Sequence, residues 1–173
     1  LKLLISKNFN VKYLNELNGN TNSLIHSIEF DSIHGKWQAN IEEGKDEIKI
    51  DGKSIKATFV ENIDDLSLDD VDIMIDCTGV HKSSSKLQKY YDKGVKKVIV
   101  SAPINEDNIV NIAYGVNHNI YKPKEHNIIT GASCTTNCIA PIIKVLHENI
   151  DDLSLDDVDI MIDCTGVHKS SSK

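Results

Sequence analysis

The sequence contains one segment twice. Residues 148–173 repeat residues 61–86, ENIDDLSLDDVDIMIDCTGVHKSSSK, without a single difference. Repeat architectures are built from three or more diverged copies with atypical ends, so this pattern predicts no solenoid. Both copies contain the same apolar strand, and two copies of one strand cannot occupy the same place in a sheet. We therefore interpret residues 1–147 as the informative sequence. Residues 148–173 are expected to be a misjoined or disordered tail, unless their strand fills a vacant position in the sheet.

The composition is that of an ordinary globular chain. Of 173 residues, 40% are hydrophobic and 26% are charged. No apolar run is long enough to span a bilayer, and the N-terminus lacks a signal-peptide pattern. The net charge of −7, with no arginine among the 19 basic residues, argues against nucleic acid as a partner. Apart from the repeated one, three cysteines without a signal peptide predict reduced thiols in a cytoplasmic protein.

Apolar patterning predicts strands that alternate with helices. We expect strands at 9–14, 71–75, 97–100 and 127–129, the second of them buried, and a β-hairpin at the Asp51-Gly52 turn. We expect one helix to end near residue 8, one over 21–30 capped at Thr21 or Asn22, one over 83–94 and one from Cys134. This alternation is typical of an α/β fold with a parallel sheet, which binds ligands at the carboxyl ends of its strands.

Three of the predicted strands are followed by polar or small residues at that edge. These residues are Glu16, the pair Thr78-Gly79, and Ser101. An acid after the second strand of a dinucleotide-binding sheet accepts hydrogen bonds from the ribose hydroxyls. Alone, an acid at a strand end is more often a helix cap or a solvated loop residue. The glycine-rich turn that would precede Glu16 is not found.

The stretch GASCTTNCIAPIIKVLHE, residues 131–148, places Cys134 where a strand gives way to a helix. The dipole and N–H groups of a helix N-terminus favour a thiolate over a thiol, and they also hold an oxyanion or a phosphate. The alternative is a buried structural cysteine, and Cys138, one turn later, fits that description. The spacing of the two cysteines, with no second pair and no nearby histidine, predicts no metal site.

Residues 132–141, ASCTTNCIAP, resemble the active-site signature of glyceraldehyde-3-phosphate dehydrogenase. Four further segments resemble that family in the expected order: FDSIHGKW (30–37), DCTGVH (76–81), KKVIVSAP (96–103) and YGVNHNIY (114–121). The resemblance covers nearly all of residues 1–147. It implies a partial NAD-binding domain of the α/β class, with an incomplete Rossmann-like parallel sheet, flanking helices and a β-hairpin insertion, that runs into the helix of the cysteine.

The resemblance also implies an activity, the NAD-dependent phosphorylating oxidation of a glycolytic aldehyde phosphate. Cys134 would be the nucleophile, and inorganic phosphate would cleave its thioester to an acyl phosphate. Ser133 and Thr135 would help to bind that phosphate. The residues implied to bind the cofactor are Glu16, Thr78, Gly79, Ser101 and Asn137, and Glu16 would favour NAD over NADP.

The sequence also departs from the family's pattern. The glycine fingerprint, the catalytic histidine and the second domain with its tetramer contacts are not found. We therefore expect a fragment that has no dehydrogenase turnover by itself and does not form the family's homotetramer. The remaining alternatives are a non-catalytic partial nucleotide-binding module, a fragment of an erythrose-4-phosphate dehydrogenase, and a misjoined product that does not fold stably. The histidines expected to be structural or solvated are His34, His81, His118, His126, His147 and, in the second copy of the repeat, His168.

Overall fold

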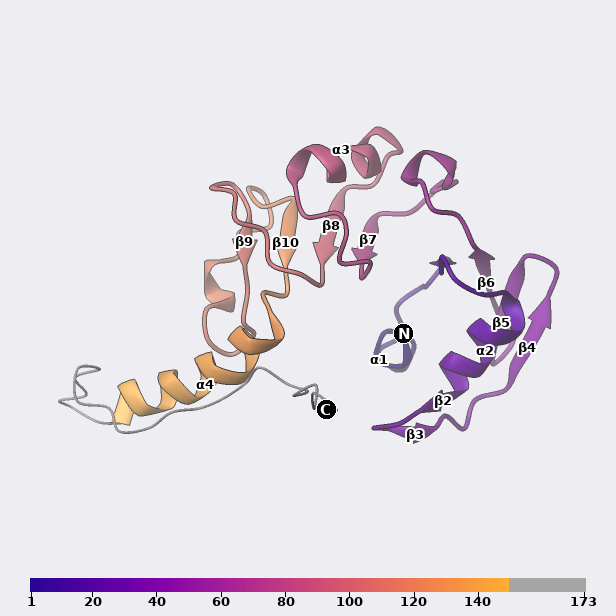
Figure 1. The fold of residues 1–173 in the computed structure, drawn as a ribbon, viewed down its shortest axis with the longest axis horizontal. Helices are drawn as coiled ribbons and strands as arrows, with labels where there is room; N and C mark the ends of the chain where they lie inside the picture. Colours follow the sequence, from indigo (N-terminus) through magenta and orange to yellow (C-terminus); the bar gives the residue numbers. More distant parts are fainter. Residues whose placement is uncertain (150–173) are drawn as a thin grey trace, which may run out of the picture. The chain divides into compact units, whose positions relative to one another are not determined.

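The computed structural model describes residues 1–149, which belong to two compact units (Figure 1). Unit 1 is Leu1–Val71, and unit 2 begins at Asp72. The last helix continues through Glu148 and Asn149, past the start of the repeated segment. The expectations for the second copy of the strand fall on residues 150–173, outside the described residues.

Unit 1 is built on a mixed four-stranded sheet of order β1-β6-β5-β4, in which only β1 and β6 pair in parallel. Two further strands, β2 and β3, form a separate antiparallel pair. Its elements are α1 (Lys2–Ser6), β1 (Tyr13–Asn15), α2 (Thr21–Glu29), β2 (Phe30–Asp31), β3 (Gly35–Lys36), β4 (Ile41–Gly44), β5 (Glu47–Ile50), β6 (Lys53–Thr58) and the 3-10 helix η1 (Ile63–Asp65).

The predicted hairpin joins β5 to β6 and supplies the core of unit 1. Asp51 and Gly52 have φ angles of 48° and 79°, and a type I′ turn requires positive φ at both central residues. Because side chains alternate between the two faces of a strand, every second residue points into the core. These buried residues are Ile48, Ile50, Ile55 and Ala57, and α2 packs against them with Leu24, Ile25 and Ile28.

Unit 1 differs from the prediction in several details, of which three have a local explanation. The strand expected over 9–14 begins only at Tyr13, because Asn8 has a φ of 60° and the N–H of Phe9 turns back to donate to the carbonyl of Leu4 at 3.0 Å. The cap of α2 is Asn20, which exchanges hydrogen bonds with Ser23 in a capping box. Strand β4 was not predicted, because its sequence IEEG lacks alternating apolar residues.

Unit 2 is built on a four-stranded sheet of order β7-β8-β10-β9, in which every pair is parallel. Val98 and Val100 of the central strand β8 are fully buried, as is Leu87 of α3. This arrangement confirms the predicted α/β class. The elements are β7 (Ile73–Asp76), α3 (Ser84–Asp92), β8 (Lys97–Val100), β9 (Val110–Asn111), the 3-10 helix η2 (His118–Ile120), β10 (Ile128–Thr130) and α4 (Cys134–Asn149).

The strand predicted to be buried, β7, lies at the edge of this sheet. Within residues 1–149 it pairs only with β8, and Ile73 and Ile75 remain 49% and 40% exposed. The prediction was wrong because an apolar run indicates a strand without indicating how many neighbours the strand has.

The two longer helices of unit 2 follow the sequence signals. Ser83 caps α3, and after its end Gly94, at a φ of 90°, donates its N–H to the carbonyl of Tyr91 at 2.8 Å. Helix α4 begins at Cys134 as predicted and extends away from the sheet (Figure 1). Pro141 lies inside α4 and has no N–H to donate to the carbonyl of Asn137.

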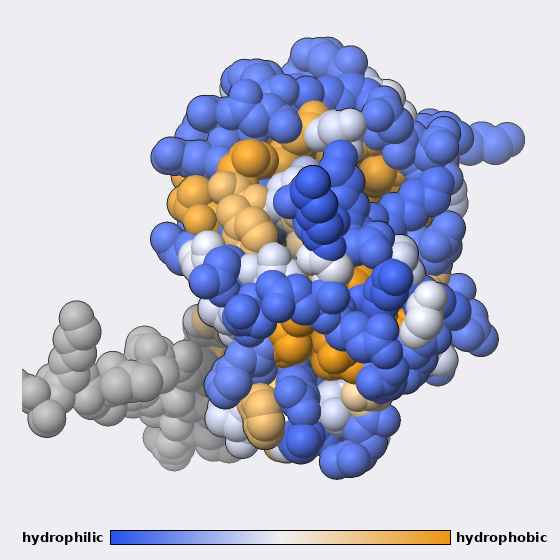
Figure 2. All heavy atoms as spheres, turned by 90° about the vertical axis from the view of Figure 1, so that its right-hand side faces the viewer, coloured by the Kyte–Doolittle hydropathy of each residue, from blue (hydrophilic) through white to orange (hydrophobic). Residues whose placement is uncertain are grey.

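The face in Figure 2 is predominantly hydrophilic, with apolar side chains in separate groups. No helix in the described part of the chain is long and apolar enough to cross a membrane.

Ile48→Ala tests whether the hairpin core stabilises unit 1. Ile48 is 0% exposed, whereas Ile33, at the β2–β3 turn, is 86% exposed. We expect Ile48→Ala to lower the free energy of unfolding of unit 1 by about 2–5 kcal/mol. The same substitution at Ile33 should change it by less than about 0.5 kcal/mol. Hydrogen exchange of the β5 and β6 amides in a urea series measures both, and equal effects would contradict the assigned core.

Candidate active site

Seven of the eight residues singled out in the sequence follow carboxyl ends of strands in unit 2. Because the strands are parallel, these ends lie at one edge of the sheet. The ladder continues beyond the strands: the N–H of Ser101 donates to the carbonyl of Asp76, and that of Gly131 to the carbonyl of Val100, each at 2.9 Å. Thr78 and Gly79 follow β7, Ser101 follows β8, and Ser133, Cys134, Thr135 and Asn137 follow β10.

Glu16 is the exception, because it belongs to unit 1. It follows the carboxyl end of β1, as predicted, and its N–H donates to the carbonyl of Thr58 at 3.0 Å. The side chain of Asn15 holds this end through hydrogen bonds with Thr58 and Val60. The carboxylate of Glu16 is exposed and, within residues 1–149, accepts a single long bond of 3.3 Å from the N–H of Asn18. Unit 1 therefore presents an accessible carboxylate at a strand end.

Side-chain hydrogen bonds hold the turn between β10 and α4. Ala132 is buried with a φ of 56°, a left-handed conformation that costs a non-glycine residue about 1–2 kcal/mol. The amide of Asn137 donates to the carbonyls of Gly131 and Ser133, at 2.7 and 2.9 Å. Ser133 Oγ accepts from the N–H of Thr136 at 3.0 Å and caps the helix. These hydrogen bonds fix the backbone of residues 131–133, which lead into α4.

Cys134 is the first residue of α4 and is exposed. N–H groups of a first helical turn lack intrahelical partners, and the dipole adds partial positive charge there. These N–H groups can donate to an oxyanion that develops beside the thiol. Thr135, which follows, is exposed as well.

Cys138 was expected to be buried, and this expectation is wrong. The residue is exposed, and no residue of α4 is buried in the described structure, because the helix extends away from the sheet (Figure 1). Ile142, which shares its face of the helix, is exposed too.

A polar cluster around Asp76 was missed by the sequence analysis. The carboxylate lies at the end of β7 and accepts four hydrogen bonds. Thr78 donates its N–H at 2.9 Å and its hydroxyl at 2.7 Å to Oδ1. His81 Nδ1 and the Tyr90 hydroxyl donate to Oδ2, at 2.7 and 3.0 Å. An acid directly after an apolar strand, as in IMIDCTG, was the signal that could have found it.

The cluster shifts the pKa values of Asp76 and Tyr90. Burial alone raises the pKa of Asp76, but the hydrogen bonds from Thr78, His81 and Tyr90 outweigh it and hold that pKa below its ordinary value of 3.8. Burial, followed by the negative charge of Asp76, raises the pKa of Tyr90. Asp76 is therefore an anion that organises the loop carrying Thr78 and Gly79.

Several histidine rings in residues 1–149 bond to groups near them in the chain. His34 pairs with Asp31 at 3.1 Å, and His81 with Asp76. His118 Nδ1 accepts from the N–H of Gly115, and His126 Nδ1 from the N–H of Lys122. No hydrogen bond joins any of these four rings to Cys134. Residues 1–149 also contain no group of three His, Cys, Asp or Glu side chains that could hold a metal ion.

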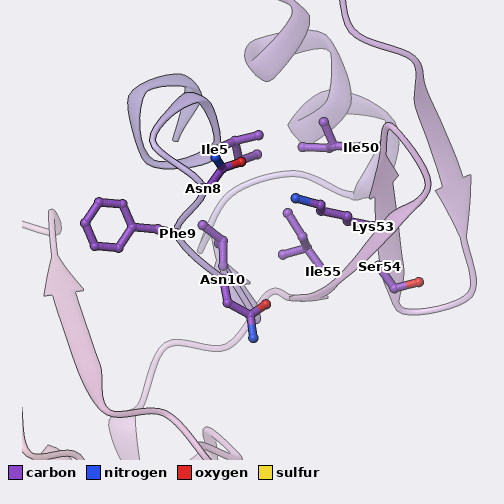
Figure 3. Close-up of a pocket in the computed structure, with 9 residues that line it drawn as sticks. Ile5, Asn8, Phe9, Asn10, Ile50, Lys53, Ser54 and Ile55 are labelled. Atoms are coloured by element: carbon purple, nitrogen blue, oxygen red, sulfur yellow. The ribbon is translucent and has the colours of Figure 1, made fainter.

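Unit 1 contains a cavity of about 380 Å³ between α1 and the hairpin, and none of the candidate residues lines it (Figure 3). Lys53 is the one charged residue in its lining. The lining residues are Ile5, Asn8, Phe9, Asn10, Val11, Ile50, Lys53, Ser54 and Ile55.

Comparison with known proteins gives one consistent result. Residues 2–84 match the model of the family "Glyceraldehyde 3-phosphate dehydrogenase, NAD binding domain". Similar curated proteins include glyceraldehyde-3-phosphate dehydrogenase 3 of Nostoc sp., 39% identical over 140 residues. The chain is 41% identical over 133 residues to glyceraldehyde-3-phosphate dehydrogenase 2 of Streptomyces avermitilis, and 39% identical over 129 residues to the enzyme of Geobacillus stearothermophilus.

These alignments cover most of this chain but less than half of each relative. The Nostoc, Streptomyces and Geobacillus alignments include 80%, 76% and 73% of the chain, and 41%, 39% and 38% of the relatives. The chain thus spans about two fifths of the length of the curated relatives it matches.

The charge of Asp76 predicts a loss of stability in acid. Because its folded-state pKa is depressed, its contribution is present above the ordinary value of 3.8 and is lost as the pH falls through the folded-state pKa. Asp76→Asn should lower the free energy of unfolding of unit 2 at neutral pH by about 1–3 kcal/mol, because the amide cannot accept all four bonds. It should also flatten the acid-dependent loss. Urea unfolding followed by exchange of the β8 amides at a series of pH values measures both, and an unchanged pH profile would refute the role of Asp76.

Proposed function

Since the chain belongs to the glyceraldehyde-3-phosphate dehydrogenase family, we propose that it supplies the cofactor-binding edge and the nucleophile for phosphorylating, NAD-dependent oxidation of a phosphorylated aldehyde. The observation that carries this proposal is the position of Cys134. Its thiol is exposed on the first turn of α4, at the sheet edge where Thr78, Gly79 and Ser101 also lie.

NAD is the cofactor of this family's domain, and the residues present suit it. The exposed carboxylate of Glu16 accepts hydrogen bonds from ribose hydroxyls, and its charge disfavours a 2′-phosphate. Thr78, Gly79 and Ser101 are small and exposed, and at Gly79 even a Cβ would meet no atom within 4 Å. We assign cofactor binding to Thr78, Gly79, Ser101 and Asn137 in unit 2, and ribose binding to Glu16 in unit 1. When bound, NAD supplies the acceptor for a hydride.

Cys134 is assigned the covalent chemistry. Its thiolate Sγ bonds to the carbonyl carbon of the aldehyde, and the carbonyl electron pair moves to oxygen, which gives a hemithioacetal oxyanion. N–H groups of the first turn of α4 stabilise that oxyanion. Loss of the aldehyde hydrogen as a hydride leaves a thioester on Sγ.

Phosphate then completes the reaction. A phosphate oxygen bonds to the thioester carbon, the C–S bond breaks, the thiolate of Cys134 is regenerated and the phosphate proton passes to solvent. We assign the binding of this phosphate to the hydroxyls of Ser133 and Thr135. Both residues flank Cys134 at a helix N-terminus, which suits an anion.

A nucleotide-binding module without turnover is the second candidate. The observation in its favour is that His34, His81, His118 and His126 bond to their own neighbours and none bonds to Cys134 within residues 1–149. NADH formation from glyceraldehyde-3-phosphate, NAD and phosphate separates the two functions. Turnover supports the enzyme, whereas NAD binding without turnover supports the module.

Alkylation by iodoacetamide tests the nucleophile without requiring turnover. At neutral pH we expect Cys134 to react about tenfold faster than Cys138, because only Cys134 lies in the first turn of α4. Saturating NAD should change the rate at Cys134 and leave that at Cys138 unchanged. Tandem mass spectrometry resolves the two cysteines, and the variant Cys134→Ser controls for the assignment. Equal rates with no effect of NAD would refute the proposed function.

Glu16→Ala tests the ribose contact. Loss of a carboxylate that accepts hydrogen bonds from the cofactor should weaken NAD binding about tenfold, and should reduce the preference for NAD over NADP. Glu43→Ala removes another exposed carboxylate of unit 1 and should leave both quantities unchanged. Titration calorimetry with each cofactor measures the affinities. If both variants bind NAD as the parent does, Glu16 is not a cofactor ligand.

A further inference from the structure

Asn111, the last residue of β9, holds the loop that follows β8. Its Nδ2 donates to the carbonyl of Ile104 at 2.8 Å, and its Oδ1 accepts from the N–H of the same residue at 3.0 Å. The amide thus pairs with Ile104 as a strand neighbour would. Ile104 is buried and lies in the loop between β8 and β9 that begins at Ser101. This contact anchors one candidate loop of the sheet edge.

The same amide reaches the turn before α4. Asn111 Oδ1 also accepts from the hydroxyl of Thr130 at 2.6 Å. Thr130 is 0% exposed, and its Oγ1 in turn accepts from the N–H of Ala132 at 3.1 Å. A continuous path of hydrogen bonds therefore runs from Ile104 through Asn111 and Thr130 to the residue with the left-handed backbone, two positions before Cys134.

We propose that Asn111 and Thr130 are positioning residues for Cys134. Asn111 fixes the loop that begins at Ser101 (the Ser101 loop) relative to the turn over residues 131–133 (the Cys134 turn). The proposal rests on the proposed function of Cys134 as the nucleophile. Neither residue touches the reacting atoms. Both act through the backbone of Ala132.

The backbone of Ala132 needs such a support. A left-handed alanine persists only where its surroundings favour that conformation over the extended one. The N–H of Ala132 is in a buried residue, so without Thr130 Oγ1 it would lose its hydrogen-bond partner. Relaxation of this φ angle would rotate the first turn of α4 and move the Sγ of Cys134.

The other support of the turn cannot replace this one. Asn137 donates to the carbonyls of Gly131 and Ser133, but it lies on α4 itself and moves with the helix. Thr130 and Asn111 lie on paired strands of the sheet. Asn117 adds to this anchor, because its Nδ2 donates to the carbonyl of Asn111 at 3.0 Å. The sheet-side contact is therefore the one that orients the helix.

Two substitutions at Thr130 separate the hydroxyl from the shape of the side chain. Thr130→Val keeps the volume and loses the hydroxyl, whereas Thr130→Ser keeps the hydroxyl. We expect Thr130→Val to lower the ratio of Cys134 to Cys138 alkylation rates about tenfold, to near equality, because Sγ of Cys134 then loses its position at the N–H groups of the first turn of α4. Thr130→Ser should keep the ratio within about twofold of the parent. An unchanged ratio in Thr130→Val overturns the proposal.

A destabilised control excludes a merely structural effect. Leu87→Ala removes a fully buried side chain of α3 and should destabilise unit 2 without touching the turn. Its alkylation ratio should remain that of the parent. A fall in Leu87→Ala as large as that in Thr130→Val would overturn the positioning role.

Hydrogen exchange distinguishes failure of this proposal from failure of the proposed function. Thr130→Val should accelerate exchange of the Ala132 amide, and Thr130→Ser should not, whether or not Cys134 is a nucleophile. Equal alkylation rates of Cys134 and Cys138 in the parent protein would overturn the proposed function. Unchanged exchange of the Ala132 amide in Thr130→Val would overturn the positioning role.

The role of Asn111 in joining the two loops has its own test. Asn111→Asp keeps an acceptor for Thr130 but places an oxygen against the carbonyl of Ile104. We expect the alkylation ratio without NAD to stay within about twofold of the parent, because the Thr130 contact persists, while the effect of NAD on Cys134 is lost. If NAD still changes the alkylation rate of Cys134 in Asn111→Asp as much as in the parent, Asn111 does not link the two loops.

Discussion

The parallel pairing of β8 with β7 on one side and β10 on the other determines where every candidate residue of unit 2 lies. Val98 and Val100 of β8 are fully buried, so this strand has little freedom to shift its register. Three chain segments must therefore leave the sheet at the same edge. The small and hydroxylic residues after each strand, and the cysteine at the start of α4, lie near one another as a consequence of this pairing.

Polar side chains that are buried or partly buried make the contacts where the ladder of backbone hydrogen bonds ends. Asp76 accepts four hydrogen bonds and orders the loop after β7. The side-chain amide of Asn111 bonds to the N–H and the carbonyl of Ile104 and also accepts from the hydroxyl of Thr130. Asp76 bonds to its own loop and to α3, and Asn111 bonds to the loop after β8 and to β10. Such connected bonds rigidify a polar site more than isolated contacts do. The edge is thus preorganised although it consists of loops.

Local signals explain what the sequence predicted correctly. The Asp51-Gly52 turn, the end of α3 before Gly94 and the start of α4 at Cys134 each depend on a few adjacent residues. Contacts between distant residues explain the failures. The exposed edge of β7 depends on its neighbours in the sheet, the exposure of Cys138 on what packs against α4, and the bond between Asn111 and Thr130 joins positions 19 residues apart. Family resemblance located the candidate residues but not the polar contacts that hold them.

Pro141 divides α4 mechanically. Because proline has no N–H, the carbonyl of Asn137 loses its helical donor, and a helix bends most readily at such a point. The turn before this joint carries Cys134 and is tied to the sheet, whereas the turns beyond it carry the exposed side chains of Ile142, Ile143 and Val145. A displacement of the turns beyond Pro141 is therefore accommodated more easily by bending at Pro141 than by moving the turn that carries Cys134.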